Sequence, residues 1–151
     1  MQLFYEDFLN NLNELHSDIE NGVDGLTPAA LDWAPQPGMN SIGVMTFHLT
    51  GAERFLIGEV IAGDNSNRDR DAEFKVQGME LNALLMRLAD NRAYISGVLE
   101  GLTLADLEAR RMFRHQREVT VAWVLGHALK HTATHTGQIQ LTRELLDRTK
   151  H

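Results

Sequence analysis

Residues 121–148, VAWVLGHALKHTATHTGQIQLTRELLDR, decide the fold of this chain. Their apolar side chains recur at steps of three and four, the period of an α-helix with one buried face. His127, His131 and His135 lie four residues apart, so they project from nearly the same side of that helix. On a helical wheel His135 falls inside the apolar stripe and His131 towards its edge, whereas His127 falls on the flank, roughly 40° beyond His131. We therefore expect a long helix over about 120–148 that directs two histidines into a core.

Three more segments, at about residues 2–22, 41–62 and 76–100, have the same helical period. Short helical turns are expected at 28–32, after Thr27-Pro28, and at 104–110, where Thr103 and Asp106 resemble a capping box. We interpret the charged stretch 64–75 as a solvated loop and leave residues 111–119 unassigned. Four long amphipathic segments without a clear strand predict an all-α fold, a four-helix bundle, in a single domain spanning 1–151.

The composition excludes several classes of protein. The 151 residues contain no cysteine, which excludes disulfides, thiolate zinc sites and a cysteine nucleophile, and fits a reducing cytoplasm. The N-terminus lacks the pattern of a secretory signal, and no apolar run approaches the ~20 residues of a membrane span. A net charge of −7 disfavours a nucleic-acid partner, because phosphate binding needs clustered Lys and Arg. We expect a cytoplasmic protein with neither a membrane nor a nucleic acid as partner.

The inward histidines predict a metal site. Two imidazoles in an apolar core are costly unless their nitrogens are satisfied, and a pair at i and i+4 can hold one metal ion. His48, in the segment 41–62, shares a stripe with Val44 and Phe55 and therefore also faces inward. His48, His131 and His135 are thus candidate ligands of one divalent ion, and three protein ligands leave a position open for water or substrate. Neutral imidazole suits zinc, nickel, iron or copper, so the ligand set alone leaves the metal open.

Other interpretations of the histidines remain. His48 taken alone is more typical of a buried histidine that is simply hydrogen-bonded. His127 is better placed as a neighbour of the ligands than as a ligand, and it is our candidate catalytic proton carrier. The other candidate bases are carboxylates of the charged stretch: Asp69, Asp71 and Glu73. We interpret the remaining histidines as ordinary residues without a site: His16, His115 and His151.

The chain resembles the DinB/YfiT-like superfamily of metalloenzymes. The resemblance rests on residues 26–35 (LTPAALDWAP), on 38–43 (GMNSIG) leading to His48, and on 131–138 (HTATHTGQ). It implies a four-helix bundle of the family's up-and-down variant type. It also implies a metal ion held by His48, His131 and His135, which we expect to be zinc first and nickel second. Relatives often carry a basic residue after the last ligand, where this chain has Thr136.

The resemblance also bears on function. Some relatives are transferases or isomerases that use a low-molecular-weight thiol such as mycothiol or bacillithiol. We therefore expect a metal-dependent enzyme of the thiol S-transferase type that acts on a small electrophile. A metal-dependent hydrolase and a non-catalytic metal-binding stress-response protein are the alternatives. The resemblance also implies a homodimer, because relatives often pair through bundle faces and the segments 2–22 and 76–100 are rich in large apolar residues.

Overall fold

The computed structural model of the protein describes residues 1–149, and they are mostly helical. There are four long helices, α1 (Leu3–Val23), α3 (Ile42–Glu53), α5 (Leu81–Glu100) and α6 (Val121–Arg148). α3 continues directly into a π-helical segment, Arg54–Ile61. The four predicted long helices are therefore present, although α5 begins at Leu81 rather than near residue 76. None of the helices among residues 1–149 combines the length and apolar character that crossing a membrane would require.

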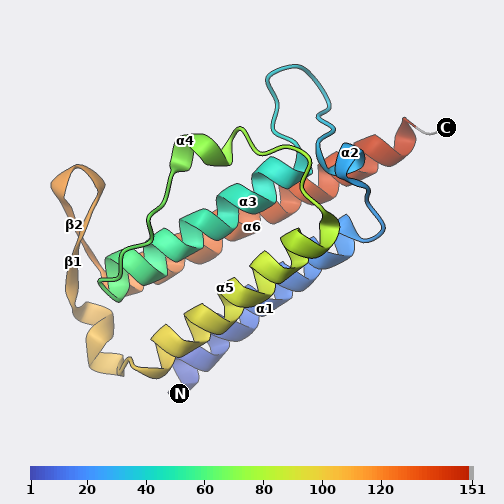
Figure 1. The fold of residues 1–151 in the computed structure, drawn as a ribbon. Helices are drawn as coiled ribbons and strands as arrows, with labels where there is room; N and C mark the ends of the chain where they lie inside the picture. The colour runs from blue at the N-terminus through green and yellow to red at the C-terminus, as the bar shows by residue number, and fades with distance from the viewer. Residues whose placement is uncertain (150–151) are drawn as a thin grey trace.

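Each long helix packs against two others: α1 and α3 both contact α5 and α6. Figure 1 shows α1 beside α5 and α3 beside α6. The segment between α3 and α5 returns along α3 and carries the short helix α4 (Arg70–Glu73). Because of this return, α5 runs in the same direction as α3.

The helix starts follow the expected capping chemistry. Ser41 Oγ accepts a hydrogen bond from Val44 N at the start of α3, at 3.2 Å. Thr120 caps α6 in the same way through Trp123 N. The expected short turns are also present, as α2 (Pro28–Leu31) and as a 3-10 segment, Leu104–Glu108, opened by the capping box of Thr103 and Asp106.

The segment 111–119, left unassigned from the sequence, belongs to a β-hairpin. Strands β1 (Arg110–Phe113) and β2 (Arg117–Thr120) pair antiparallel and lead directly into α6. Their tight connection, Arg114–Gln116, includes positive φ angles at His115 and Gln116. Phe113 packs against the rings of Phe55 and Trp123, with centroids 6.1 and 5.3 Å apart. The hairpin therefore packs against the π-helical segment that follows α3 and against the first turn of α6.

The buried apolar side chains form two clusters along the helices. One includes Phe8, Leu56, Ile95 and Val124, at the hairpin end. The other includes Ile19, Leu49, Leu84 and Ile139, towards α2. Along each long helix, a buried polar residue comes between the stretches that supply the two clusters: His16, Glu53, Asn91 and Thr132. These four residues form a polar layer with one member from each long helix.

Glu53 is the centre of this polar layer. Its carboxylate has no solvent exposure and lies 3.0 Å from Nε2 of His16. Asn91 Nδ2 and Thr132 Oγ1 each donate to it at 2.6 Å. The interpretation of His16 as an ordinary residue is therefore wrong, because His16 is fully buried and paired with a carboxylate from α3. His115 is exposed at the hairpin turn, and His151 lies outside the described residues.

Candidate metal centre

Three histidine side chains meet between α3 and α6. One nitrogen from each of His48, His131 and His135 can be chosen so that all three lie within 4.8 Å of one another. The ring centroids are 5.1 Å apart for His48 and His131, 5.0 Å for His48 and His135, and 4.6 Å for His131 and His135. His48 is buried, and the two histidines of α6 are half-buried. Among residues 1–149 this is the one group of three or more His, Asp or Glu side chains arranged to hold a metal ion.

Hydrogen bonds orient two of the three rings. His48 Nδ1 lies 2.8 Å from Oε2 of Glu73, and an imidazole nitrogen this close to a carboxylate carries the proton. His135 Nδ1 lies 2.7 Å from Oε1 of Gln138, one turn further along α6, and donates to it. Both bonds leave the lone pair on Nε2. This is the arrangement by which second-sphere groups hold histidine ligands towards a metal ion.

His131 differs from the other two. Its Nδ1 is buried and has no hydrogen-bond partner within residues 1–149. Burial first, and then the neighbouring His135, His48 and His127, lower the pKa of His131 to about 3. Burial and the nearby His48 likewise lower the pKa of His135. Both rings are therefore neutral at pH 7, which is the form that binds a metal.

The group fits a divalent ion. A buried nitrogen without a partner is costly in a folded protein, and a metal ion would satisfy it. Two nitrogens bound to one zinc ion at about 2.0–2.1 Å are at most about 4.2 Å apart. The spacing within 4.8 Å therefore needs only small side-chain rotations to match. All three donors are imidazoles, which suits zinc or nickel better than calcium or magnesium.

Glu73 and Arg68 form a second layer behind His48. The Arg68 guanidinium donates to both oxygens of Glu73, at 2.6 and 2.8 Å, and both side chains are almost fully buried. Burial raises the pKa of the Glu73 carboxyl, but the hydrogen bonds from Arg68 and His48 outweigh it and hold that pKa below its ordinary value. The interpretation of 64–75 as a solvated loop is therefore wrong for these two residues. Asp71 is exposed, and Asp69 caps α4 by accepting from Ala72 N.

Glycine at position 51 makes room for this second layer. A Cβ at Gly51 would overlap Oε1 of Glu73 and lie 3.4 Å from Nε of Arg68. The α3 backbone therefore approaches the carboxylate more closely than any other residue would permit. This glycine, in the helix interior after His48, is the sequence signal that something packs tightly there.

His127 lies beside the three histidines without joining them. Its ring stacks on Trp123, with centroids 4.7 Å apart, and lies 6.4 Å from the ring of His131. Burial, followed by the charges of Lys130, Arg114 and Arg117, lowers the pKa of His127. It is therefore a neutral proton acceptor at pH 7, next to the group and on its hairpin side.

A cavity of about 90 Å³ joins these side chains. His48, His127 and His131 all line it, together with aromatic and arginine side chains from the hairpin, from the π-helical segment and from the start of α4 and the residues just before it. Trp33, in the loop before α3, packs instead against the apolar cluster near α2. The cavity is thus bordered by the hairpin, through Phe113 and Arg114, and by Arg68 and Arg70, which lie far from the hairpin in the sequence.

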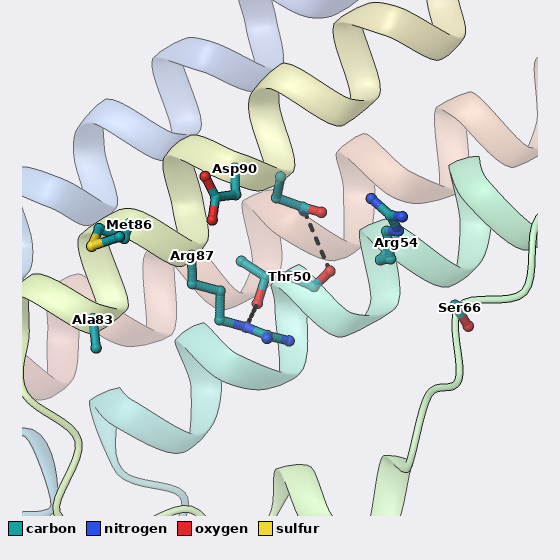
Figure 2. A pocket seen from close by; sticks show the side chains of 8 residues that line it. Thr50, Arg54, Ser66, Ala83, Met86, Arg87 and Asp90 are labelled. Atoms are coloured by element: carbon teal, nitrogen blue, oxygen red, sulfur yellow. Dashed lines mark hydrogen bonds between the residues drawn. The ribbon is translucent and has the colours of Figure 1, made fainter.

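A larger hollow of about 570 Å³ lies between α3 and α5. Figure 2 shows Arg87 beside Thr50, to which its Nε donates a hydrogen bond at 2.6 Å. Arg54, Met86 and Asp90 also line this hollow. None of the three grouped histidines lines this hollow. The smaller cavity between α3 and α6 is therefore the one beside the candidate metal ligands.

Comparison with known proteins agrees with this arrangement. The sequence model of the DinB superfamily matches residues 11–139. The chain belongs to the DinB superfamily. Proteins of the DinB superfamily generally bind a metal ion, and the matched range contains the three grouped histidines. Among curated proteins, none matches this sequence.

Solved structures share the DinB fold. A conserved protein from Enterococcus faecalis is 19% identical, with a TM-score of 0.78 over 97% of this chain and 98% of its own. A DinB-like protein from Bacillus cereus ATCC 10987 is also 19% identical, with a TM-score of 0.73 over 91% of this chain and 89% of its own. At this identity the likeness concerns the fold.

Proposed function

We propose that this DinB-superfamily protein is a metal-dependent enzyme of the thiol S-transferase type, acting on a small electrophile. The observation that carries the proposal is the grouping of His48, His131 and His135 beside a cavity that His127 also lines. His48, His131 and His135 would hold one divalent ion, zinc or nickel. When bound, such an ion supplies a positive charge that lowers the pKa of a thiol in its open position.

The surrounding residues prepare the three histidines for this task. Glu73 accepts a hydrogen bond from Nδ1–H of His48, and Gln138 accepts one from Nδ1–H of His135, so both rings already have the tautomer that leaves Nε2 free. Arg68 in turn holds both oxygens of Glu73. Partners of this kind are typically worth 10–100-fold in metal affinity.

His127 would receive the proton that the thiol loses. It lines the same cavity as His48 and His131, and its lowered pKa keeps it neutral at pH 7. The stack on Trp123 holds its ring in place. Of the described residues that line the cavity, none is an aspartate or glutamate. His127 is therefore the base that we assign to the reaction.

This weak base favours a thiol over water as the nucleophile. A bound zinc ion would lower the pKa of water from about 15.7 to about 7, whereas a thiol, whose free pKa is near 8.5, would be deprotonated outright on coordination. A neutral histidine with a lowered pKa is matched to the easier deprotonation. Glu73 is unsuited to help, because its carboxylate is already held by His48 and Arg68.

The finer structural expectations also belong to this proposal. We propose that the four long helices form the up-and-down bundle variant of the DinB type, in a cytoplasmic homodimer. The large apolar residues of α1 and α5 are mainly buried within the chain, so a dimer contact through these helices would use their exposed ones, such as Leu3 and Phe4 of α1 and Met86 of α5. Light scattering at micromolar concentration tests this, and a mass of only 17.0 kDa would count against the dimer.

The reaction is tested with 1-chloro-2,4-dinitrobenzene, whose chloride is displaced by a thiol sulfur. Zinc-loaded wild type, chelated wild type, His135→Ala and the control His115→Ala are compared with several low-molecular-weight thiols. We expect turnover only for the loaded wild type and the control. His127→Gln should retain the metal and lower the rate most at pH values where the free thiol is protonated.

Other outcomes distinguish the alternatives. Metal-dependent turnover of ester substrates with water alone would favour a hydrolase. Inactivity with both nucleophiles, in protein shown to contain the metal, would favour a non-catalytic metal-binding protein.

A further inference from the structure

The cavity beside the three histidines is unusually positive. Three arginines line it, Arg68, Arg70 and Arg114, whereas the described lining residues include no carboxylate. The chain as a whole carries a net charge of −7. Positive charge is therefore concentrated at one place on a protein that otherwise repels anions.

The three arginines differ in their partners. Arg68 is neutralised by Glu73 and is therefore structural. Within residues 1–149, neither Arg70 nor Arg114 forms an ion pair. Arg70 instead lies over the ring of Phe74, at 5.0 Å, and Arg114 over the ring of Phe55, also at 5.0 Å. Two guanidinium groups thus line the cavity without an ion-pair partner among the described residues.

The fold brings these two charges together from distant segments. Arg70 begins α4, and Arg114 begins the hairpin turn, whose positive φ angles at His115 and Gln116 reverse the chain. Burial, and then the charges of Arg68 and Arg70, lower the pKa of Arg114, which agrees with their closeness. Holding like charges near one another costs energy that a bound anion would recover.

The hollow between α3 and α5 lacks this character. There Arg87 already donates to Thr50 Oγ1 and to the Phe47 carbonyl, and its guanidinium stacks on the Phe47 ring at 3.6 Å. Asp90 adds a negative charge to the same wall (Figure 2). An anion would therefore be favoured at the histidine cavity.

We propose that Arg70 and Arg114 form an anion subsite that binds a carboxylate, sulfonate or phosphate group of the small-molecule substrate. The inference rests on the proposed function, since that function brings the reacting end of the substrate to the three histidines. A cavity of about 90 Å³ accommodates only the reacting end of the substrate and its anionic group, so the rest of the molecule extends past the hairpin. Phe113, which lines the cavity, offers an apolar contact there. Paired guanidinium donors are well matched to planar or tetrahedral oxyanions.

The test is a nuclear magnetic resonance titration of ¹⁵N-labelled protein with benzoate, phenylphosphonate and the neutral control benzamide. It follows the Trp123 indole N–H and the arginine Nε–H signals. We expect both anions to bind, and Arg114→Gln or Arg70→Gln to weaken them roughly tenfold or more, as for the loss of a charged hydrogen bond. Arg110→Gln is the matched control, because Arg110 lies on the same hairpin, pairs with Glu118 and does not line the cavity. Its affinity should equal that of wild type.

Repeating the titration with chelated protein and with His135→Ala separates this inference from the proposed function. Anion binding that persists without metal and depends on the two arginines supports the subsite, even if the metal chemistry fails. Binding that disappears with the metal would overturn it, because the anion would then be a metal ligand. Equal binding of benzamide and benzoate, or unchanged affinity in both arginine variants with native-like spectra, would also overturn it. The ratio of the two anion affinities tells a carboxylate site from a phosphate site.

Discussion

Replacing Gly51 with alanine sets two effects of opposite sign against each other. In the interior of a helix, alanine is more favourable than glycine by about 0.8–1.0 kcal/mol. At this position, however, the new Cβ would overlap Oε1 of Glu73. The carboxylate must then leave its place against His48 and Arg68.

The structure indicates which effect is larger. Displacing Glu73 loses hydrogen bonds to charged groups, worth about 1.5–3 kcal/mol each, and so outweighs the helix propensity. With the two bonds from Arg68 lost and the helix propensity gained, we expect Gly51→Ala to be net destabilised by about 2–5 kcal/mol. Because His48 also loses the acceptor that orients it, zinc affinity should fall by about 10–100-fold.

The control is Gly97→Ala on α5. Gly97 is exposed, and a Cβ there would meet nothing within 4 Å. This variant should be stabilised by up to about 1 kcal/mol, with unchanged zinc affinity. Urea titration measures the stability, and competition with a chromophoric chelator measures the affinity. If Gly51→Ala behaves like Gly97→Ala in both assays, Glu73 does not support His48 as described.

Three further predictions concern stability. Chelation should lower the melting temperature without unfolding the protein, because both apolar clusters remain. His48→Ala should abolish this sensitivity to the chelator. Scanning fluorimetry with and without chelator measures the shift, and an identical melting temperature of the wild type in both samples would contradict the prediction. The pKa of His131 is about 3 in the native protein and near 6.5 when unfolded, so the unfolded chain binds more protons between these values. Chelated protein should therefore lose stability as the pH falls from about 6.5 towards 3, and the chelated His131→Gln variant should lose it less steeply. Thermal melts at stepped pH measure the slope of stability against pH for each protein, and equal slopes would show that the pKa of His131 is not lowered. Glu53→Ala removes the acceptor of three buried donors and should lower the free energy of unfolding by about 3–5 kcal/mol, as measured by urea titration. The control Glu14→Gln, on an exposed part of α1, should leave that free energy unchanged. A similar result for both variants would show that the polar layer is dispensable.

The long helices were predictable because their apolar periodicity is strong and local. The same periodicity identified His48, His131 and His135 as inward-facing, and the structure groups them. The hairpin was missed because its strands have four residues each, too few for a clear alternation. Its turn also places His115 and Gln116 in a left-handed conformation, which the presence of these residue types does not predict.

The second layer of the site could not be predicted from local sequence. Glu73 and Arg68 stand in a charged run, and nothing in such a run distinguishes a solvated carboxylate from one that folds back onto a helix 25 residues away. His16 was missed for a similar reason, because its partner Glu53 lies 37 residues further along the chain. Pairings of this kind depend on how the helices pack, which periodicity alone does not specify.

Elemental analysis tests most directly whether the three histidines hold one metal ion. Protein without an affinity tag is loaded with zinc, or with nickel in a parallel sample, dialysed to remove unbound ion, and compared with His48→Ala, His131→Ala and the exposed control His115→Ala. We predict one ion per chain in the wild type and in the control, and a large loss in the other two variants. A wild type that retains no ion, or ligand variants that retain as much as the control, would contradict the assignment.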